Sequence, residues 1–139
     1  MSMKSINPTN GQVIREYPQM ENADARKAIS AAHKAHLKWR KVSFEKRALL
    51  MKAAARVLRE NAQRFAILMA EEMGKPVKAG RGEIEKCAWV CEYYADHAET
   101  FLKHEEVPID GTRNFVAFEP IGVVLAVMPW NFPFWQVFR

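Results

Sequence analysis

The sequence predicts an α/β fold, and three observations carry that prediction. Long segments between residues 24 and 103 combine alanine-rich composition with apolar side chains at helical spacing. Residues 121–128 form a continuous apolar run rich in β-branched side chains, which is typical of a strand buried on both faces of a parallel sheet. Near the start, the turn-forming residues 7–11 lie between Ile6 and the pair Val13 and Ile14, which indicates two short strands joined by a turn.

The first two helices are predicted from their caps and apolar stripes. Asp24 is the candidate N-cap of a helix over residues 25–39. Ser43 is the candidate N-cap of the next helix, with Glu45 in the first turn, where the helix dipole favours an acid. The apolar stripe of the first helix is Ala28, Ala31, Ala32, Ala35 and Trp39, and that of the second is Leu50, Ala54, Val57 and Leu58.

Asn61 is expected to restart the helix, which then ends at Gly74 as a C′ glycine. Pro76 suits the first turn of a third long helix over residues 77–103. The buried side of that helix is predicted to carry Ile84, Trp89 or Ala88, Cys91, Tyr94 and Ala98.

The helical pattern stops at Pro108 and Asp110-Gly111, and Asp-Gly is a strong hairpin signal. Residues 113–118 alternate loosely and are predicted to form a strand. The buried strand over residues 121–128 needs neighbours on both sides, yet the sequence ends at Arg139. Residues 132–138 are also too apolar for a surface tail, so we expect an incomplete α/β domain.

Composition excludes several functional classes. The chain has 139 residues, of which 49% are hydrophobic and 27% charged, which suits one folded domain. No apolar run reaches the roughly 18 residues of a membrane helix, and the amino terminus lacks a signal-peptide core, so we expect a cytoplasmic protein without a membrane partner. The net charge of +5 comes from basic residues at helical spacing, which indicates solvated helix faces and no nucleic-acid partner.

The sequence offers little support for a metal site or a disulfide. Cys87 and Cys91 are four residues apart on one predicted helix, and the ordinary interpretation is two buried thiols. His33 and His36 are three apart and could share a metal, but no third ligand has suitable spacing nearby. We therefore expect no metal.

Three runs resemble the aldehyde dehydrogenase superfamily, in its order and at about its spacing. They are Asn7-Pro8-Thr9-Asn10-Gly11, Glu71-Glu72-Met73-Gly74-Lys75-Pro76 and Met128-Pro129-Trp130-Asn131-Phe132-Pro133. The last run is quite specific, and the other two support it. The resemblance covers the whole chain, which matches about the first third of a typical member. The pattern that ends at Arg139 is similar to bacterial NAD(P)-dependent succinate-semialdehyde dehydrogenases.

The resemblance implies a mechanism and residue roles. Family members attack a small aldehyde with a cysteine thiolate, pass hydride to NAD or NADP, and hydrolyse the thioester with a glutamate-activated water. It assigns Asn131 as the catalytic amide that stabilises the oxyanion. It places Val127, Met128, Pro129, Trp130 and Asn131 against the cofactor, and assigns substrate binding to Phe132, Gln136 and Arg139. Arg139 would hold a distal carboxylate, since a guanidinium fits a carboxylate as a planar fork.

The resemblance also implies what this chain lacks. The catalytic cysteine of the family has a Gly-Gln-x-Cys context, which neither Cys87 nor Cys91 shares, so we expect the chain alone to be inactive. The family's organisation divides the chain into a hairpin and helices of the cofactor-binding domain (1–103), oligomerisation strands (104–119) and the start of a Rossmann-like core (120–139). The parent would be a homodimer or homotetramer. The alternative is a non-enzymatic helical module that binds a partner.

Overall fold

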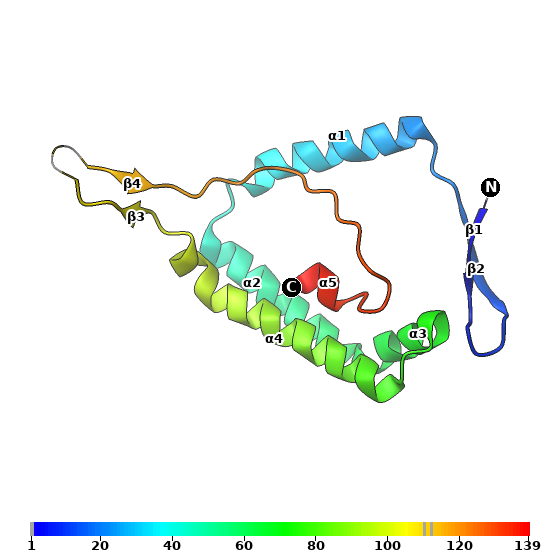
Figure 1. Ribbon diagram of the computed structural model, residues 1–139. Helices are drawn as coiled ribbons and strands as arrows, with labels where there is room; N and C mark the ends of the chain where they lie inside the picture. Colours follow the sequence, from blue (N-terminus) through cyan, green and yellow to red (C-terminus); the bar gives the residue numbers. More distant parts are fainter. Residues whose placement is uncertain (1, 110, 112) are drawn as a thin grey trace.

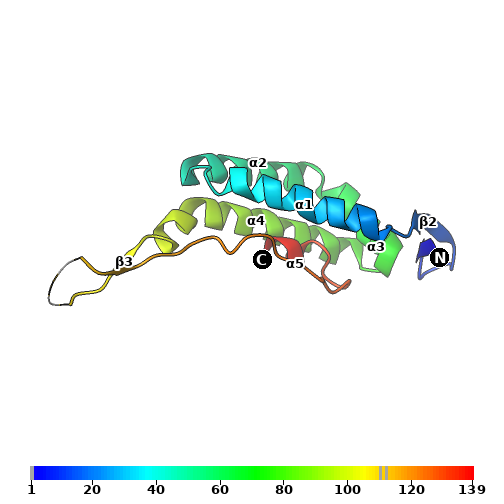
Figure 2. The ribbon, with the colours of Figure 1, turned by 90° about the horizontal axis from the view of Figure 1, so that it is seen from above.

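The computed structural model describes residues 2–109, 111 and 113–139 (Figure 1). Its elements, in chain order, are β1 (Ser2–Ile6), β2 (Val13–Pro18), α1 (Asn22–Trp39), α2 (Phe44–Glu60), α3 (Ala62–Met73), α4 (Val77–Phe101), β3 (Glu105–Glu106), β4 (Phe115–Val116) and α5 (Trp135–Phe138). The β1-β2 hairpin and the β3-β4 hairpin lie at opposite ends of the molecule, with the helices between them (Figures 1 and 2).

The core lies where α2, α3 and α4 meet. α2 and α4 run antiparallel side by side, and the short helix α5 (red in Figure 1) packs against α4. Phe65, Phe134, Trp135 and Phe138 are half-buried and cover the core. The buried core residues are Ala55, Leu58, Met69, Ile84, Cys87, Ala88 and Cys91.

Local chemistry at several element ends is confirmed. β1 and β2 pair antiparallel, and the Asn7 side chain accepts a hydrogen bond from the Thr9 amide at 2.9 Å in the turn between them. The Ser43 hydroxyl accepts from the Lys46 amide, as an N-cap should. Gly74 ends α3 in the left-handed region with φ +72°, and Asn61 separates α2 from α3.

The predicted start of the first helix is wrong. α1 begins at Asn22, and Glu21 occupies the cap position without a side-chain cap bond. The Asp24 amide already donates to the Glu21 carbonyl at 3.0 Å, so Asp24 lies inside the first turn and its carboxylate pairs with Lys27 instead.

The predicted apolar stripes are only partly right. None of the residues of α1 is buried, so its alanine and Trp39 stripe is exposed. On α2, Leu58 is buried, but Leu50 and Val57 are each 48% exposed. Helical spacing identifies an apolar face but not the element that packs on it. Here α4 covers the face of α2 that contains Ala55 and Leu58.

α4 follows its prediction more closely. Ile84, Ala88 and Cys91 are buried as expected, while Trp89 and Tyr94 are exposed. Tyr94 contacts the ring of Tyr93 in an edge geometry. The helix ends at Phe101, two residues before the predicted end. None of the helices in the described part of the chain is long and apolar enough to cross a membrane.

The predicted strand over residues 121–128 is wrong for this structure. The segment is outside any strand or helix, and Ile121, Leu125 and Val127 are 93%, 89% and 86% exposed. A strand needs a hydrogen-bonded neighbour, and no described residues pair with this segment. The predicted strand over residues 113–118 is reduced to β4, which pairs antiparallel with β3. This pairing confirms a hairpin around Gly111, while Asp110 lies outside the described residues.

A close approach between α3 and α4 depends on Gly80. A Cβ atom added there would lie 3.0 Å from both Cα and Cβ of Ala66, whereas one added at Gly82 meets nothing within 4 Å. We predict that Gly80→Ala lowers the free energy of unfolding by about 1 kcal/mol or more through overpacking. The matched control Gly82→Ala raises it by ~0.5–1 kcal/mol through helix propensity. Urea unfolding measures both, and an equal gain from the two substitutions would contradict the packing.

The two cysteines are buried, free thiols on α4. Burial raises the pKa of Cys87 to about 12, and it raises the pKa of Cys91 as well. The unfolded chain therefore releases these protons at lower pH than the folded chain. The stability that the thiol form contributes is present below the ordinary thiol pKa and is lost as pH rises toward the folded value.

We predict that neither thiol reacts with a disulfide reagent in the folded chain at about pH 8, because the nucleophilic form is the thiolate. Both react once urea unfolds the chain. Fast reaction of Cys87 in the folded chain would contradict the burial of this side chain.

Candidate functional site

The Asn131 loop comprises residues 130–135. It follows the exposed segment of residues 121–129 and includes Trp135, the first residue of α5. The Gln136 amide donates to the Phe132 carbonyl at 3.1 Å, which folds the loop directly into the first turn of α5. The loop packs against α3, where the ring centroids of Phe134 and Phe65 are 5.0 Å apart. The helix α5, which begins at Trp135, contacts α4.

A buried ion pair lies beneath this loop. Lys75 follows the αL residue Gly74 in the connection between α3 and α4, and Glu83 lies in the second turn of α4. Their side chains form a salt bridge and are only 9% and 3% exposed. Charged side chains are rarely buried unless they are paired, so this pair is unusual among the ion pairs of the described residues.

Both members of the pair also bind the backbone of the loop. Lys75 Nζ donates a hydrogen bond to the carbonyl oxygen of Asn131 at 2.8 Å. Glu83 Oε1 accepts from the amides of Phe134 and Trp135, each at 3.0 Å. The backbone of the loop is therefore anchored at Asn131 and at Phe134 and Trp135. These hydrogen bonds are stronger than neutral ones because each involves a charged side chain.

Aromatic contacts reinforce the same anchoring. Lys75 Nζ lies 4.0 Å from the ring centroid of Phe132, and Lys86 Nζ lies 3.9 Å from that of Trp135. These cation–π distances are within the favourable range, so both rings beside the anchored backbone have a cationic partner.

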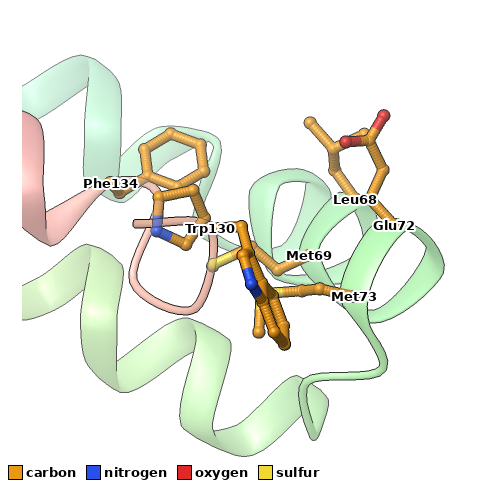
Figure 3. Close-up of a pocket in the computed structure, with 7 residues that line it drawn as sticks. Leu68, Met69, Glu72, Met73, Trp130 and Phe134 are labelled. Atoms are coloured by element: carbon orange, nitrogen blue, oxygen red, sulfur yellow. The ribbon is translucent and has the colours of Figure 1, made fainter. Parts of the chain in front are cut away.

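A largely apolar cavity of about 260 Å³ opens between the loop and α3 (Figure 3). Its walls are Leu68, Met69, Glu72, Met73, Trp130, Pro133 and Phe134. In Figure 3 the Trp130 indole lies beside Met69 and Met73. Glu72 and Met73 of the Glu71–Pro76 run therefore lie beside Trp130 and Pro133 of the Trp-Asn-Phe-Pro run, although the two runs are far apart in sequence.

Asn131 lies on the surface of the loop. The residue is exposed, and within the described residues its side-chain amide makes no hydrogen bond. An amide N–H that is free of protein partners is available to an oxygen of a bound ligand, and its backbone is held from beneath by Lys75.

The other predicted site residues are spread over two regions. Val127, Met128 and Pro129 lie in the exposed extended segment before the loop, and Phe132 lies on Lys75. Gln136 is half-buried in α5. Arg139 lines a different groove of about 660 Å³ between α2 and α4, together with Trp39, Phe44, Arg47 and Tyr94. The described chain therefore groups Asn131 with Phe132 and Trp130, and it places Arg139 in another groove.

Glu83 was not among the predicted site residues, and Lys75 had no predicted role. Glu83 precedes Cys87 by four residues and Cys91 by eight, so it lies on the buried face of α4. An acidic residue at a buried helical position needs a cationic or hydrogen-bonding partner. The spacing from Cys87 and Cys91 was therefore the signal that Glu83 is buried. Its partner, Lys75, is identified only by the structure, in which the α3–α4 connection brings the two side chains together.

Other charged groups tie α2 to α4 away from the loop. Arg59 contacts Glu85 and Glu92, and Lys52 contacts Asp96. The Arg59 guanidinium lowers the pKa of Glu92, and Lys52 lowers that of Asp96. Among the described residues, no three His, Cys, Asp or Glu side chains gather as a metal site would require.

Comparison with known proteins gives the same family throughout. The aldehyde dehydrogenase family's sequence profile matches residues 1–139. A probable NADP(+) succinate-semialdehyde dehydrogenase of Synechocystis is 40% identical over 139 residues, which are 100% of this chain and 31% of that protein. The NAD(P)+ succinate semialdehyde dehydrogenase Sad of Escherichia coli is 34% identical over 97% of this chain and 29% of its own length.

The fold agrees with these sequence matches. The crystal structure of succinic semialdehyde dehydrogenase from Streptococcus pyogenes in complex with NADP+ superposes with a TM-score of 0.91 at 32% identity. The superposition covers 97% of this chain and 30% of that one, so the chain spans about 30% of the length of these relatives. The motif resemblance is confirmed along the whole sequence, and the chain belongs to the aldehyde dehydrogenase family.

Proposed function

We propose that this chain is the amino-terminal part of a cytoplasmic NAD(P)-dependent dehydrogenase that oxidises succinate semialdehyde to its carboxylic acid. The observation that carries the proposal is Asn131, an exposed residue whose side-chain amide has no hydrogen-bond partner among the described residues and whose backbone carbonyl is held by Lys75. The succinate-semialdehyde relatives support the substrate, because their names state it and they match nearly all of this chain.

Asn131 acts on the oxygen of the aldehyde. When a thiolate adds to the carbonyl carbon, the C=O π electrons move onto oxygen, and the Asn131 amide donates a hydrogen bond to that developing negative charge. A donor already aimed at this position stabilises the transition state more than the ground state. Anchoring of the Asn131 carbonyl supports this role, since it limits movement of the donor's backbone.

The segment before Asn131 fits the nicotinamide end of the cofactor. Val127 is 86% exposed, Met128 43% and Trp130 72%, so they offer an accessible apolar wall beside Asn131. Such a wall suits the flat face of a nicotinamide ring. The bound cofactor supplies the hydride acceptor, and these residues exclude water from that face.

Arg139 is proposed to bind the distal carboxylate of the substrate, with Phe132 and Gln136 beside the chain of the aldehyde. Arg139 follows α5 directly and lines a groove other than the cavity beside Trp130, and it is exposed, so its guanidinium is accessible to a ligand. A planar guanidinium forms two parallel hydrogen bonds to a carboxylate, which supports a carboxylated aldehyde over a neutral one.

The 139-residue chain itself is proposed to be inactive. Its cysteines are buried in α4 with raised pKa values, and neither is a nucleophile available to an aldehyde. We further propose that residues 1–103 belong to the cofactor-binding domain, residues 104–119 to the oligomerisation strands of a homodimer or homotetramer, and residues 120–139 to the start of the Rossmann-like core. The projecting β3-β4 hairpin supports the second assignment.

We predict that the purified chain produces no NADPH from succinate semialdehyde and NADP+ above a heat-treated control. A chimera that carries these residues in place of the matching part of the Synechocystis relative is expected to be active. In that chimera, Asn131→Ala lowers kcat by about 100- to 1,000-fold, the usual loss for one oxyanion donor. Turnover by the chain alone would overturn the inactivity, and an unchanged kcat would overturn the role of Asn131.

In the same chimera, Arg139→Ala is predicted to raise the KM for succinate semialdehyde by about 10- to 100-fold, because a hydrogen bond to a charged group is lost. The KM for butanal, which lacks the carboxylate, serves as the matched control and should change little. Equal effects on the two aldehydes would contradict carboxylate recognition by Arg139.

A further inference from the structure

We propose that Lys75 and Glu83 are positioning residues, which act on the reaction only by fixing the Asn131 loop. This inference rests on the proposed oxyanion role of Asn131. The ion pair touches neither substrate nor cofactor in the proposed site, because both of its side chains are buried beneath the loop.

The pair holds the loop at both ends, with one hydrogen bond at Asn131 and two at Phe134 and Trp135. Lys75 Nζ binds the carbonyl oxygen of Asn131 itself at 2.8 Å, and Glu83 Oε1 binds the amides of Phe134 and Trp135 at 3.0 Å. The salt bridge joins these two contacts, so movement at either end of the loop must break a charge-assisted hydrogen bond. The backbone of Asn131 is thereby restrained at its carbonyl oxygen.

The loop matches the ion pair in polarity as well as in position. It offers a carbonyl to the ammonium group and two amides to the carboxylate. With an apolar side chain at either position, these backbone groups would lose partners beneath the loop, and a buried polar group without a partner is costly. This requirement explains a buried pair where apolar packing would usually be at least as stable.

Neighbouring charges on α4 do not share this arrangement. Glu85 lies two residues after Glu83 and is 59% exposed, where it pairs with Arg59 of α2. Lys86 contacts the ring of Trp135, but no backbone atom of the loop. Glu85 therefore provides a matched control on the same helix, with the same chemistry and a partner on α2.

The test uses the full 139-residue chain and amide hydrogen exchange followed by NMR. The variants are Glu83→Gln, Lys75→Met and the conservative Lys75→Arg, with Glu85→Gln as the control. We expect Glu83→Gln and Lys75→Met to speed exchange at the Phe134 and Trp135 amides by about 10-fold or more. Exchange at the core amides of Leu58 and Ile84 stays within about threefold, since local opening leaves the core closed.

A second signature reports on Asn131 directly. Lys75→Met should shift the carbonyl ¹³C resonance of Asn131, because that oxygen loses its cationic donor. Lys75→Arg should restore most of the protection at Phe134, because the positive charge is kept. Glu85→Gln should alter neither the carbonyl resonance nor the exchange at the loop.

Two results would overturn the proposal. One is unchanged exchange at Phe134 and Trp135 in Glu83→Gln. The other is equal acceleration at the loop and the core, which would show a general stabilising role. If Glu83→Gln unfolds the chain, Lys75→Arg and Lys75→Met decide by the same comparison of loop and core amides.

Failure of this inference is distinguishable from failure of the proposed function. The exchange experiment requires no aldehyde turnover, so it succeeds or fails on the loop alone. A failed function instead leaves kcat of the chimera unchanged by Asn131→Ala.

Discussion

The buried Lys75–Glu83 ion pair is the interaction on which the candidate site depends. It joins the α3–α4 connection, the second turn of α4 and the backbone of the Asn131 loop, which are remote from one another in sequence. Removing one partner of such a pair typically costs about 3–5 kcal/mol, because a buried charge is left without compensation. A buried ion pair is therefore useful where a particular backbone geometry is needed, and here that geometry is the backbone of the loop at Asn131.

Other features of the described fold position the Lys75–Glu83 ion pair. Gly74 lets the chain turn so that Lys75 enters the interior, and Gly80 lets α4 approach α3 closely beside Glu83. Arg59 and its two glutamate partners hold α2 along α4. Asn131 is therefore an exposed residue whose backbone is connected to the helical core through Lys75 and Glu83.

Local chemistry at most element ends was predictable from sequence, except for the N-cap of α1, and long-range partners were not. The cap at Ser43, the αL residue Gly74 and the Asn7 turn each depend on side chains within a few residues, and the structure confirms them. The strand over residues 121–128 was wrong because a strand is defined by neighbours, and the described chain provides none. Glu83 was missed because its partners, Lys75 and the backbone amides of the Asn131 loop, are remote in sequence. The spacing of residues within α4 does not specify them.

The motif around Asn131 identified the family, and the structure adds a reason for its geometry. If the ion pair acts through Asn131, a double-mutant cycle in the active chimera measures that dependence most directly. We expect Glu83→Gln to lower kcat about tenfold or more when Asn131 is present, and to have little further effect in the Asn131→Ala background. Equal losses of kcat in the two backgrounds would contradict the account, because the ion pair would then act independently of the amide.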